Sequence, residues 1–261
     1  MSSLLVRGEG GRVAITPASA GWRYVSFSTA RVGKGARFVV ATEESEVCIV
    51  ILGGRCSVRI GVVNWPEVGE RETPFDGPPH AVYAPPNTNL ELRAGRAEVQ
   101  LAIASAPATK GAKLRHIRPA DARREVRGSG VMERTIHHIL MEDAPAESLL
   151  VTEVVTPAGH WSSYPPHKHD TDDPPNETQL EETYYHRLRD PRGFAVQRVY
   201  TADRSLDETV AVRDGDLVLV PRGFHTVSAA PGYELYYLNA MAGPVRQWCV
   251  TFDPEHEWLR R

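Results

Sequence analysis

The sequence predicts an all-β fold that consists of two related β-barrels in tandem. Apolar residues alternate with polar ones or form short runs, which is typical of strands, and long helical periodicity is absent. The 21 glycines and 20 prolines are spread along the 261 residues, as expected for many short strands joined by tight turns. A weak internal repeat relates residues 77–87 to residues 215–223, because in both an apolar strand ends at a proline turn.

We divide the chain accordingly into a first barrel of residues 1–114 and a second barrel of residues 115–261. The strands expected in the first barrel are 21–28, 37–41, 46–52, 56–60, 81–84, 90–93 and 98–104. The strands expected in the second barrel are 134–139, 149–156, 182–188, 195–200, 209–212, 217–220, 226–229 and 233–241. The basic segment 115–127 is expected to lead from one barrel to the other, with a short helix at 119–124.

The composition is that of a soluble globular protein, with 41% hydrophobic and 24% charged residues. A net charge of −3 gives no reason to expect nucleic acid or an anionic membrane as a partner, and no apolar run reaches the roughly 18 residues of a membrane span. The first residues carry charge too early for the apolar core of a signal peptide. Cys48, Cys56 and Cys249 lack a metal-type spacing, so we expect buried thiols in a reducing cytoplasm.

Histidines and carboxylates gather in the second half. His167 and His169 stand two residues apart, so on a strand they point to the same side of the sheet. His225 follows a strand and a Pro-x-Gly turn, and Glu181 and Glu182 lie between the two segments. Imidazole and carboxylate on one inward face are ligands for a divalent metal ion such as zinc, manganese or iron. Such a set leaves coordination positions open, which indicates catalysis rather than a structural site.

Neighbouring residues on a strand face opposite ways, so Glu181 and Glu182 do not both point into a barrel. We choose Glu182 as the ligand because it begins a Glu-x-x-Tyr pattern, and we expect Glu181 in a solvated loop or on the outer face. Tyr184 and His186 face the same way as Glu182. Tyr184 is a candidate catalytic residue, with a barrel-lining aromatic as the alternative, and His186 is more simply explained as structural.

Several longer segments resemble one known family. In the second half they include Thr-Pro-Ala-Gly-His-Trp-Ser-Ser-Tyr-Pro-Pro-His-Lys-His-Asp at 156–170 and Leu-Glu-Glu-Thr-Tyr-Tyr-His-Arg at 180–187. Further segments are 193–201, 231–244 and 253–258, and the first half contributes 15–27. All of them resemble the 5-deoxy-glucuronate isomerase family of the cupin superfamily. The spacing between His169 and Glu182 is longer than in the general cupin pattern.

The resemblance implies a bicupin, which consists of two double-stranded β-helix (jelly-roll) barrels, with no metal ligands in the first. It implies an aldose–ketose isomerase of myo-inositol catabolism that converts 5-deoxy-D-glucuronate into 5-dehydro-2-deoxy-D-gluconate through a metal-stabilised enediolate. Carried onto this sequence, the family pattern assigns a divalent metal ion to His167, His169, Glu182 and His225. We also expect a homo-oligomer, because barrels with spare sheet edges favour association.

A uronic-acid substrate requires a cation for its carboxylate. Arg198 is our first candidate, because a guanidinium binds a carboxylate through two hydrogen bonds. Lys168 lies between two ligands and is expected to point away from them. His160 is expected to pack near the site rather than to bind metal. The polar loop of residues 170–181 is either a solvated surface loop or a lid.

Two other functions remain open at this stage. A metal-dependent cupin dioxygenase would use the same ligands, and oxygen consumption would distinguish it from an isomerase. A non-catalytic, sugar-binding bicupin would keep its ligand after loss of the metal, although open coordination positions argue against this reading.

Overall fold

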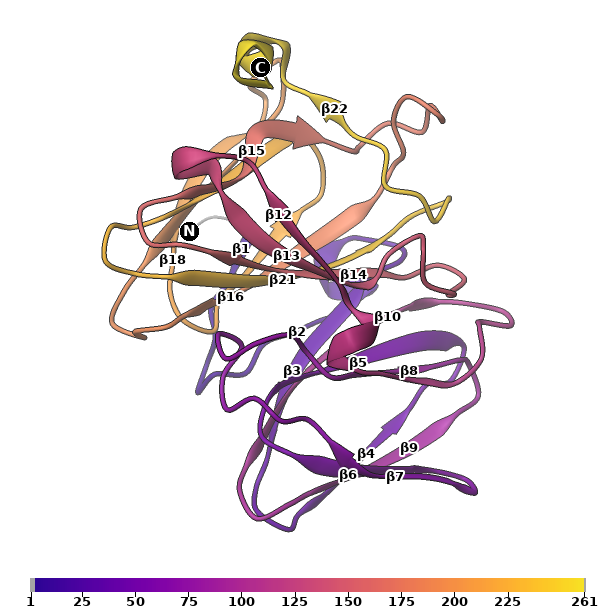
Figure 1. The fold of residues 1–261 in the computed structure, drawn as a ribbon. Coiled ribbons are helices and arrows are strands. Elements are labelled where there is room, and N and C mark those ends of the chain that lie inside the picture. Colours follow the sequence, from indigo (N-terminus) through magenta and orange to yellow (C-terminus); the bar gives the residue numbers. More distant parts are fainter. Residues whose placement is uncertain (1–2, 261) are drawn as a thin grey trace.

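The computed structural model describes residues 3–260, and strands dominate it (Figure 1). The elements of the first barrel are β2 (Ala14–Ile15), α1 (Pro17–Ala20), β3 (Ser26–Val32), β4 (Arg37–Ala41), β5 (Ser45–Gly53), β6 (Cys56–Ile60), β7 (Val63–Val68), β8 (Ala81–Ala84), β9 (Asn89–Ala94), β10 (Val99–Pro107) and β11 (Arg115–Ile117). They form a six-stranded sheet in the order β11-β8-β5-β10-β3-β2 and a four-stranded sheet in the order β4-β9-β6-β7.

The second barrel is also made of two antiparallel sheets. Its elements are β1 (Leu5–Val6), η1 (Pro119–Asp121), β12 (Arg123–Arg127), η2 (Gly130–Met132), β13 (Arg134–Leu140), β14 (Leu150–Thr156), β15 (Trp161–Lys168), β16 (Glu181–Leu188), β17 (Ala195–Tyr200), β18 (Asp207–Val212), β19 (Leu217–Val220), β20 (Phe224–Ala229), β21 (Leu235–Ala242), β22 (Thr251–Phe252) and η3 (Pro254–Arg260). The larger sheet has the order β1-β19-β16-β21-β14-β13-β12, and the smaller one has the order β18-β17-β20-β15-β22. The predicted all-β class is confirmed.

The two barrels share one strand arrangement. In the larger sheets, β8-β5-β10-β3-β2 corresponds to β19-β16-β21-β14-β13, and in the smaller sheets β4-β9-β6-β7 corresponds to β15-β20-β17-β18. The sequence repeat therefore marks equivalent positions, since β8 and β19 are the strands that end at the two proline turns. Strands β12 and β22 have no counterparts among the described residues of the first barrel.

Two short strands lie outside the half from which we expected them. Strand β1 pairs with β19, so residues close to the start of the chain belong to the larger sheet of the second barrel. Strand β11 pairs with β8, so residues 115–117 belong to the larger sheet of the first barrel. The division at residue 114 remains our proposal for the two barrels. Strands β1 and β11 connect the barrels, because each pairs with a strand of the other half of the chain.

Most strand bounds lie close to those expected, and β4, β6, β8, β17 and β19 have the expected bounds. Strand β3 differs most, since it begins at Ser26 rather than at residue 21. The helix expected at 119–124 is the single turn η1, after which the chain continues as β12. Among the described residues, no helix has the length and apolar character needed to cross a membrane.

Three large apolar clusters hold the sheets together, and a small fourth cluster consists of Met141, Leu150, Leu180 and Met241. One cluster fills each barrel, between its larger and smaller sheet. A third cluster contains residues of both larger sheets, among them Phe27 and Tyr83 of the first barrel and Tyr185 and Leu238 of the second. The two larger sheets therefore pack on each other in the middle of the molecule, with a smaller sheet on either side (Figure 1).

Buried charges also join the two barrels. Arg71 of the first barrel makes two hydrogen bonds of 2.9 Å to the carboxylate of Glu153 on β14, and both side chains are almost completely buried. Glu153 also accepts hydrogen bonds from Tyr236 and His137. This pairing satisfies a charge from each barrel at the surface where the barrels meet.

Two further glutamates connect the barrels in a reciprocal way. Glu46 on β5 accepts hydrogen bonds from the backbone N–H groups of residues 147, 148 and 149, just before β14. Glu181 on β16 accepts hydrogen bonds from those of residues 23, 24 and 25, just before β3. Glu181 therefore lies on the outer face of its barrel, one of the two expected positions, but it is a structural acceptor at the contact between the barrels and not a residue of a solvated loop. The same contact explains the late start of β3.

Candidate metal centre and cavity

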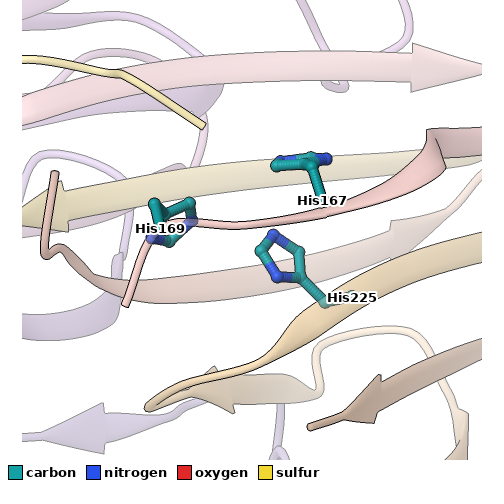
Figure 2. Close-up of side chains that lie close together, drawn as sticks. All are labelled: His167, His169 and His225. Atoms are coloured by element: carbon teal, nitrogen blue, oxygen red, sulfur yellow. The ribbon is translucent and has the colours of Figure 1, made fainter. Parts of the chain in front are cut away.

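The second barrel brings the four predicted ligands together between its two sheets. His167 lies near the end of β15, and His169 follows directly after that strand. His225 is the second residue of the adjacent strand β20. Figure 2 shows the three imidazole rings grouped together. Glu182, the second residue of β16, reaches this group from the facing sheet.

The donor atoms of these residues, which we call the ligand group, are close to one another. One nitrogen from each of His167, His169 and His225 lies within 4.8 Å of the others. Oε2 of Glu182 is 2.9 Å from Nε2 of His169 and 3.1 Å from Nε2 of His225. All four side chains are buried. Structure and sequence therefore agree on which side chains meet.

Backbone carbonyls hold two of the rings by their Nδ1 atoms. Nδ1 of His169 is 3.1 Å from the carbonyl oxygen of Leu180, and Nδ1 of His225 is 3.1 Å from that of Gly223. For His225 we assign the ring proton to this bond, which leaves a lone pair on Nε2. That Nε2 atom is buried without a hydrogen-bond partner and faces the carboxylate of Glu182. A cation between such a lone pair and a carboxylate would satisfy both, so the donor set fits a divalent metal ion.

Electrostatic interactions favour a neutral His167 and an ionised Glu182 in the ligand group. Burial lowers the pKa of His167 well below its ordinary value, and the charges of His225 and His169 act in the same direction. For Glu182 burial acts to raise the pKa, but His169 and His225 outweigh it and lower the pKa to about 2. For His169, burial acts to lower the pKa, but the hydrogen bond to Glu182 outweighs it and raises the pKa. A neutral imidazole and an ionised carboxylate are the forms in which these side chains act as ligands.

The turn before β20 positions His225 and requires glycine. Gly223 has a φ of +89°, and a Cβ atom there would lie 2.4 Å from the carbonyl oxygen of Tyr200. The N–H of Gly223 donates a hydrogen bond of 2.7 Å to Asp170, directly after the His-x-His pair. The predicted Pro-x-Gly turn thus links the two histidine segments to each other.

The base of the loop of residues 170–181 is anchored rather than free. Lys168 points away from the ligand group, as predicted, and donates hydrogen bonds to Asp170 and Glu177. Glu177 and Thr178 are buried, and the hydroxyl of Thr178 donates a 2.6 Å hydrogen bond to the carbonyl of Gln247. Only residues 171–176 of the loop are exposed as a group. The loop therefore supports the ligand group from the side.

A cavity adjoins the ligand group, and it consists of two neighbouring parts that share some of their lining residues. The inner cavity has a volume of about 60 Å³ and is lined by Arg127, Arg134, Ile136, His138, Met141, Thr152, Val154, Ser163, His167, Glu182, Tyr184, Tyr237, Asn239, Met241 and Trp248. An outer hollow of about 290 Å³ shares Arg127, Arg134, His167 and Trp248 with it. Two of the predicted ligands, His167 and Glu182, thus face a space that a small molecule can enter.

Tyr184 lines this cavity beside Glu182, as strand alternation predicted. Its hydroxyl lies 2.9 Å from Oγ of Ser163, and its ring packs edge-on against His225. Burial raises the pKa of Tyr184 well above its ordinary value, so the hydroxyl keeps its proton near neutral pH. Tyr184 is therefore suited to donate a hydrogen bond and not to act as a base. His186 pairs with Gln197 inside the barrel, in a structural role.

The structure does not place Arg198 at the cavity. Its neighbour Gln197 is fully buried and faces inward, so alternation along β17 turns Arg198 to the outer face. There its guanidinium makes two hydrogen bonds of 2.8 Å to Asp207 and lies over the ring of Tyr200. The expected contact between Arg198 and a substrate carboxylate is thus contradicted by the direction of the side chain.

Two polar residues of β13 line the cavity instead, and the sequence analysis missed both. Arg134, Ile136 and His138 follow one another at every second position of the strand, and all three side chains face the cavity. Alternation within the segment 134–140 was the available signal, but nothing in the sequence showed that β13 faces the ligand group. His160 lies outside the ligand group, where its Nδ1 is 2.9 Å from the carbonyl oxygen of Glu133.

The fold and the site define a class of protein: a bicupin in which one barrel carries a group of three histidines and one glutamate beside a cavity. Comparison with known sequences narrows this class. The chain belongs to the KduI/IolB family, whose family model matches residues 4–259.

Relatives and solved structures of similar fold agree with this assignment. The chain is 49% identical over 252 residues to a 5-deoxy-glucuronate isomerase of Geobacillus kaustophilus, covering 96% of this chain and 91% of the relative. It is 41% identical over 247 residues to the 5-deoxy-glucuronate isomerase of Bacillus subtilis strain 168, covering 94% and 91%. An IolB-like protein from Salmonella typhimurium LT2 superposes with a TM-score of 0.96 at 43% identity, covering 99% of both chains. Oxalate decarboxylase of Bacillus subtilis shares the fold alone, with a TM-score of 0.66 at 13% identity, covering 97% and 80%.

Proposed function

We propose that this chain is a 5-deoxy-glucuronate isomerase, which converts the aldose 5-deoxy-D-glucuronate into the ketose 5-dehydro-2-deoxy-D-gluconate. Relatives that carry this name align with nearly the whole chain. The observation that carries the proposal is the ligand group at the wall of a cavity that also presents Tyr184 and Arg134. An aldose–ketose exchange of an acid requires groups that polarise the carbonyl, remove the proton from C2, return a proton at C1 and bind the carboxylate.

The ligand group is the proposed site of a divalent ion, which we take to be zinc, manganese or iron. His167, His169, Glu182 and His225 supply three imidazoles and one carboxylate, and the unpaired Nε2 of His225 supports this role. A bound divalent ion would supply Lewis acidity for the aldehyde carbonyl and its neighbouring hydroxyl.

The chain's own side chains would hold the substrate in the cavity. The protonated hydroxyl of Tyr184 is placed to donate a hydrogen bond to a substrate oxygen, while Ser163 fixes its direction. Tyr237 lines the same wall and contacts Ser162 through its hydroxyl, which orders this side of the cavity. Met241 and Val154 close the cavity on the side of the larger sheet and limit the access of water.

The test is turnover of 5-deoxy-D-glucuronate, followed by NMR under anaerobic conditions, with protein loaded with each of the three metals. We expect the 2-deoxy-5-keto acid to appear, and we expect His169→Ala to lower kcat at least 1000-fold with loss of bound metal. His160→Ala is the matched control, because this histidine lies outside the ligand group and its loss leaves turnover unchanged. Conversion without oxygen excludes a dioxygenase. Absence of conversion with all three metals contradicts the proposal.

Cellular location and assembly belong to the same proposal. We place the enzyme in the cytoplasm, which is supported by the three free cysteines: Cys48 and Cys56 are buried and Cys249 is partly exposed. We also propose a homo-oligomer, supported by the edge strand β12, which has one sheet neighbour in the described chain.

A further inference from the structure

Arg134 is a buried cation without an acidic partner at the wall of the cavity. Its exposed fraction is 7%, and within residues 3–260 it forms no ion pair. Its hydrogen bond is one from Nη1 to the carbonyl oxygen of Met132, at 3.0 Å. The neighbouring Arg127, which faces the same cavity, is by contrast paired twice with Glu125, at 2.7 and 3.1 Å. Arg134 therefore lacks the direct ion pair that Arg127 has.

Burial of an arginine is costly unless its N–H groups and its charge find partners. Two other arginines that lie at least partly below the surface are satisfied in this way. Arg71 has the carboxylate of Glu153, and Arg246 donates to three backbone carbonyls. Arg134 lines both the inner cavity and the outer hollow, so its remaining N–H groups are open to a molecule that enters. An anion in the cavity would supply the missing partner.

The hairpin between β12 and β13 leaves space for this guanidinium. Gly128 has a φ of +84°, and a Cβ atom there would lie 2.9 Å from Nη1 of Arg134 and 2.2 Å from the carbonyl oxygen of Met132. Arg134 is also near the ligand group, since it lines both parts of the cavity together with His167. One small molecule can therefore contact the arginine and the ligand group at the same time.

We propose that Arg134 binds the carboxylate of the uronic-acid substrate and thereby directs the aldehyde end toward the ligand group. The inference rests on the proposed isomerase function and identifies the residue that selects an acid over a neutral sugar. A guanidinium forms two parallel hydrogen bonds with a carboxylate, which fixes the orientation of the substrate as well as its charge.

His138 lies on the same face of β13 as Arg134, to which we assign the substrate carboxylate. Its Nε2 is 2.8 Å from Oε2 of Glu125, which orients the ring, and its Nδ1 is buried without a hydrogen-bond partner. The wall made by β12 and β13 thus presents one cation to the cavity beside a histidine ring that Glu125 holds in place.

The experiment compares two substrates that differ only at one end. Wild type, Arg134→Met and Arg134→Lys are assayed with 5-deoxy-D-glucuronate and with 5-deoxy-D-glucose, in which a CH₂OH group replaces the carboxylate. We expect Arg134→Met to lower kcat/KM for the acid about 100-fold, mainly through KM, and to change that for the neutral sugar less than threefold. Arg134→Lys keeps the charge without the paired geometry and should recover part of the loss. Arg198→Met is the control and should match wild type, because that arginine lies on the outer face.

The neutral sugar is also measured as a competitive inhibitor of the acid, so the comparison holds even if its turnover is too slow to detect. Melting temperature and metal content report on folding and on the ligand group. An unchanged KM for the acid in Arg134→Met, or an equal loss with both sugars, would overturn the role of Arg134. A wild-type protein that converts neither sugar would instead refute the isomerase function itself, so the two failures are distinguishable.

Discussion

The two barrels have the same strand order, but only the second has polar side chains at one part of its interior. Glu46 and Glu181 occupy equivalent places, because each accepts three backbone hydrogen bonds from the other barrel. Counting from them, the inward residues of β5 are Val47, Ile49 and Ile51, whereas those of β16 are Glu182, Tyr184 and His186. The first barrel is thus filled with aliphatic side chains, and the second holds a polar site.

Strand pairing extends the comparison to the smaller sheets. The pair of Val40 and Leu90 in the first barrel corresponds to the pair of His167 and His225 in the second. Both leucine and valine pack into the apolar cluster of the first barrel. The shared strand arrangement therefore accommodates either an apolar core or a ligand group at the same positions. A few inward side chains determine which barrel carries the site.

The first prediction removes the polar character of the second barrel at one position. His225→Leu installs the residue found at the equivalent place, so we expect the barrel to fold but to lose its metal site. Bound metal should fall below one tenth of the wild-type content and kcat/KM by at least 1000-fold, because an essential ligand is gone. Metal analysis, circular dichroism and turnover measure the three quantities. Retention of stoichiometric metal would show that His225 is not a ligand.

The second prediction concerns the buried pair between the barrels. Glu153→Gln leaves Arg71 without a counter-charge in a buried place, so we expect the free energy of unfolding to fall by about 3–5 kcal/mol. Urea unfolding followed by fluorescence gives this value. Arg189→Gln, which breaks an exposed pair with Glu234, is the control and should cost less than about 1 kcal/mol.

The pH dependence of the same pair gives a signed test. Burial acts to raise the pKa of Glu153, but Arg71 and His137 outweigh it, so the folded-state pKa lies below its ordinary value of 4.5. The carboxylate therefore contributes stability that is present above pH 4.5 and is lost as the pH falls through the lowered folded-state pKa. The difference in stability between wild type and Glu153→Gln should be constant from pH 7 to 5 and narrow below 4.5. A difference that widens on acidification would contradict this account.

The sequence was sufficient for the fold class, the repeat and the ligand group, because these depend on local signals. Alternation identified β5, β16 and most other strands, and the His-x-His pair with the Pro-x-Gly turn identified the three histidines that the structure brings together. Strand β15 escaped the list of strands because Pro165 and Pro166 interrupt its pattern, and its pairing with β20 shifts register between Ser162 and His167.

Residues whose role depends on the packing of distant strands were not predictable. Arg198 seemed suitable as a residue type, but its strand turns it outward to Asp207. Arg134 looked like one basic residue among many, and only the position of β13 beside the cavity gives it a role. Glu181 likewise acquires its partners from residues more than 150 positions earlier in the chain. A single sequence carries no direct signal for such contacts.

The last prediction, with the smallest expected effect, compares the two reciprocal glutamates. Glu46→Gln and Glu181→Gln each weaken charge-assisted hydrogen bonds to three backbone N–H groups, so each should cost about 1–3 kcal/mol of stability. Glu46 is fully buried and also accepts from Tyr83, so its replacement should cost more. Urea unfolding measures both losses.

Activity should separate the two variants even though their structural roles match. Glu181 precedes the ligand Glu182 on β16, so loosening its anchor shifts the strand that supports the ligand group, and we expect kcat/KM to fall several-fold. Glu46 precedes Val47, which lines no site, so Glu46→Gln should keep wild-type turnover at temperatures where it is folded. Equal activity losses would mean that the first barrel contributes to catalysis through the contact between the barrels. Loss in Glu181→Gln alone would confine the function to the second barrel and leave the first as its structural support.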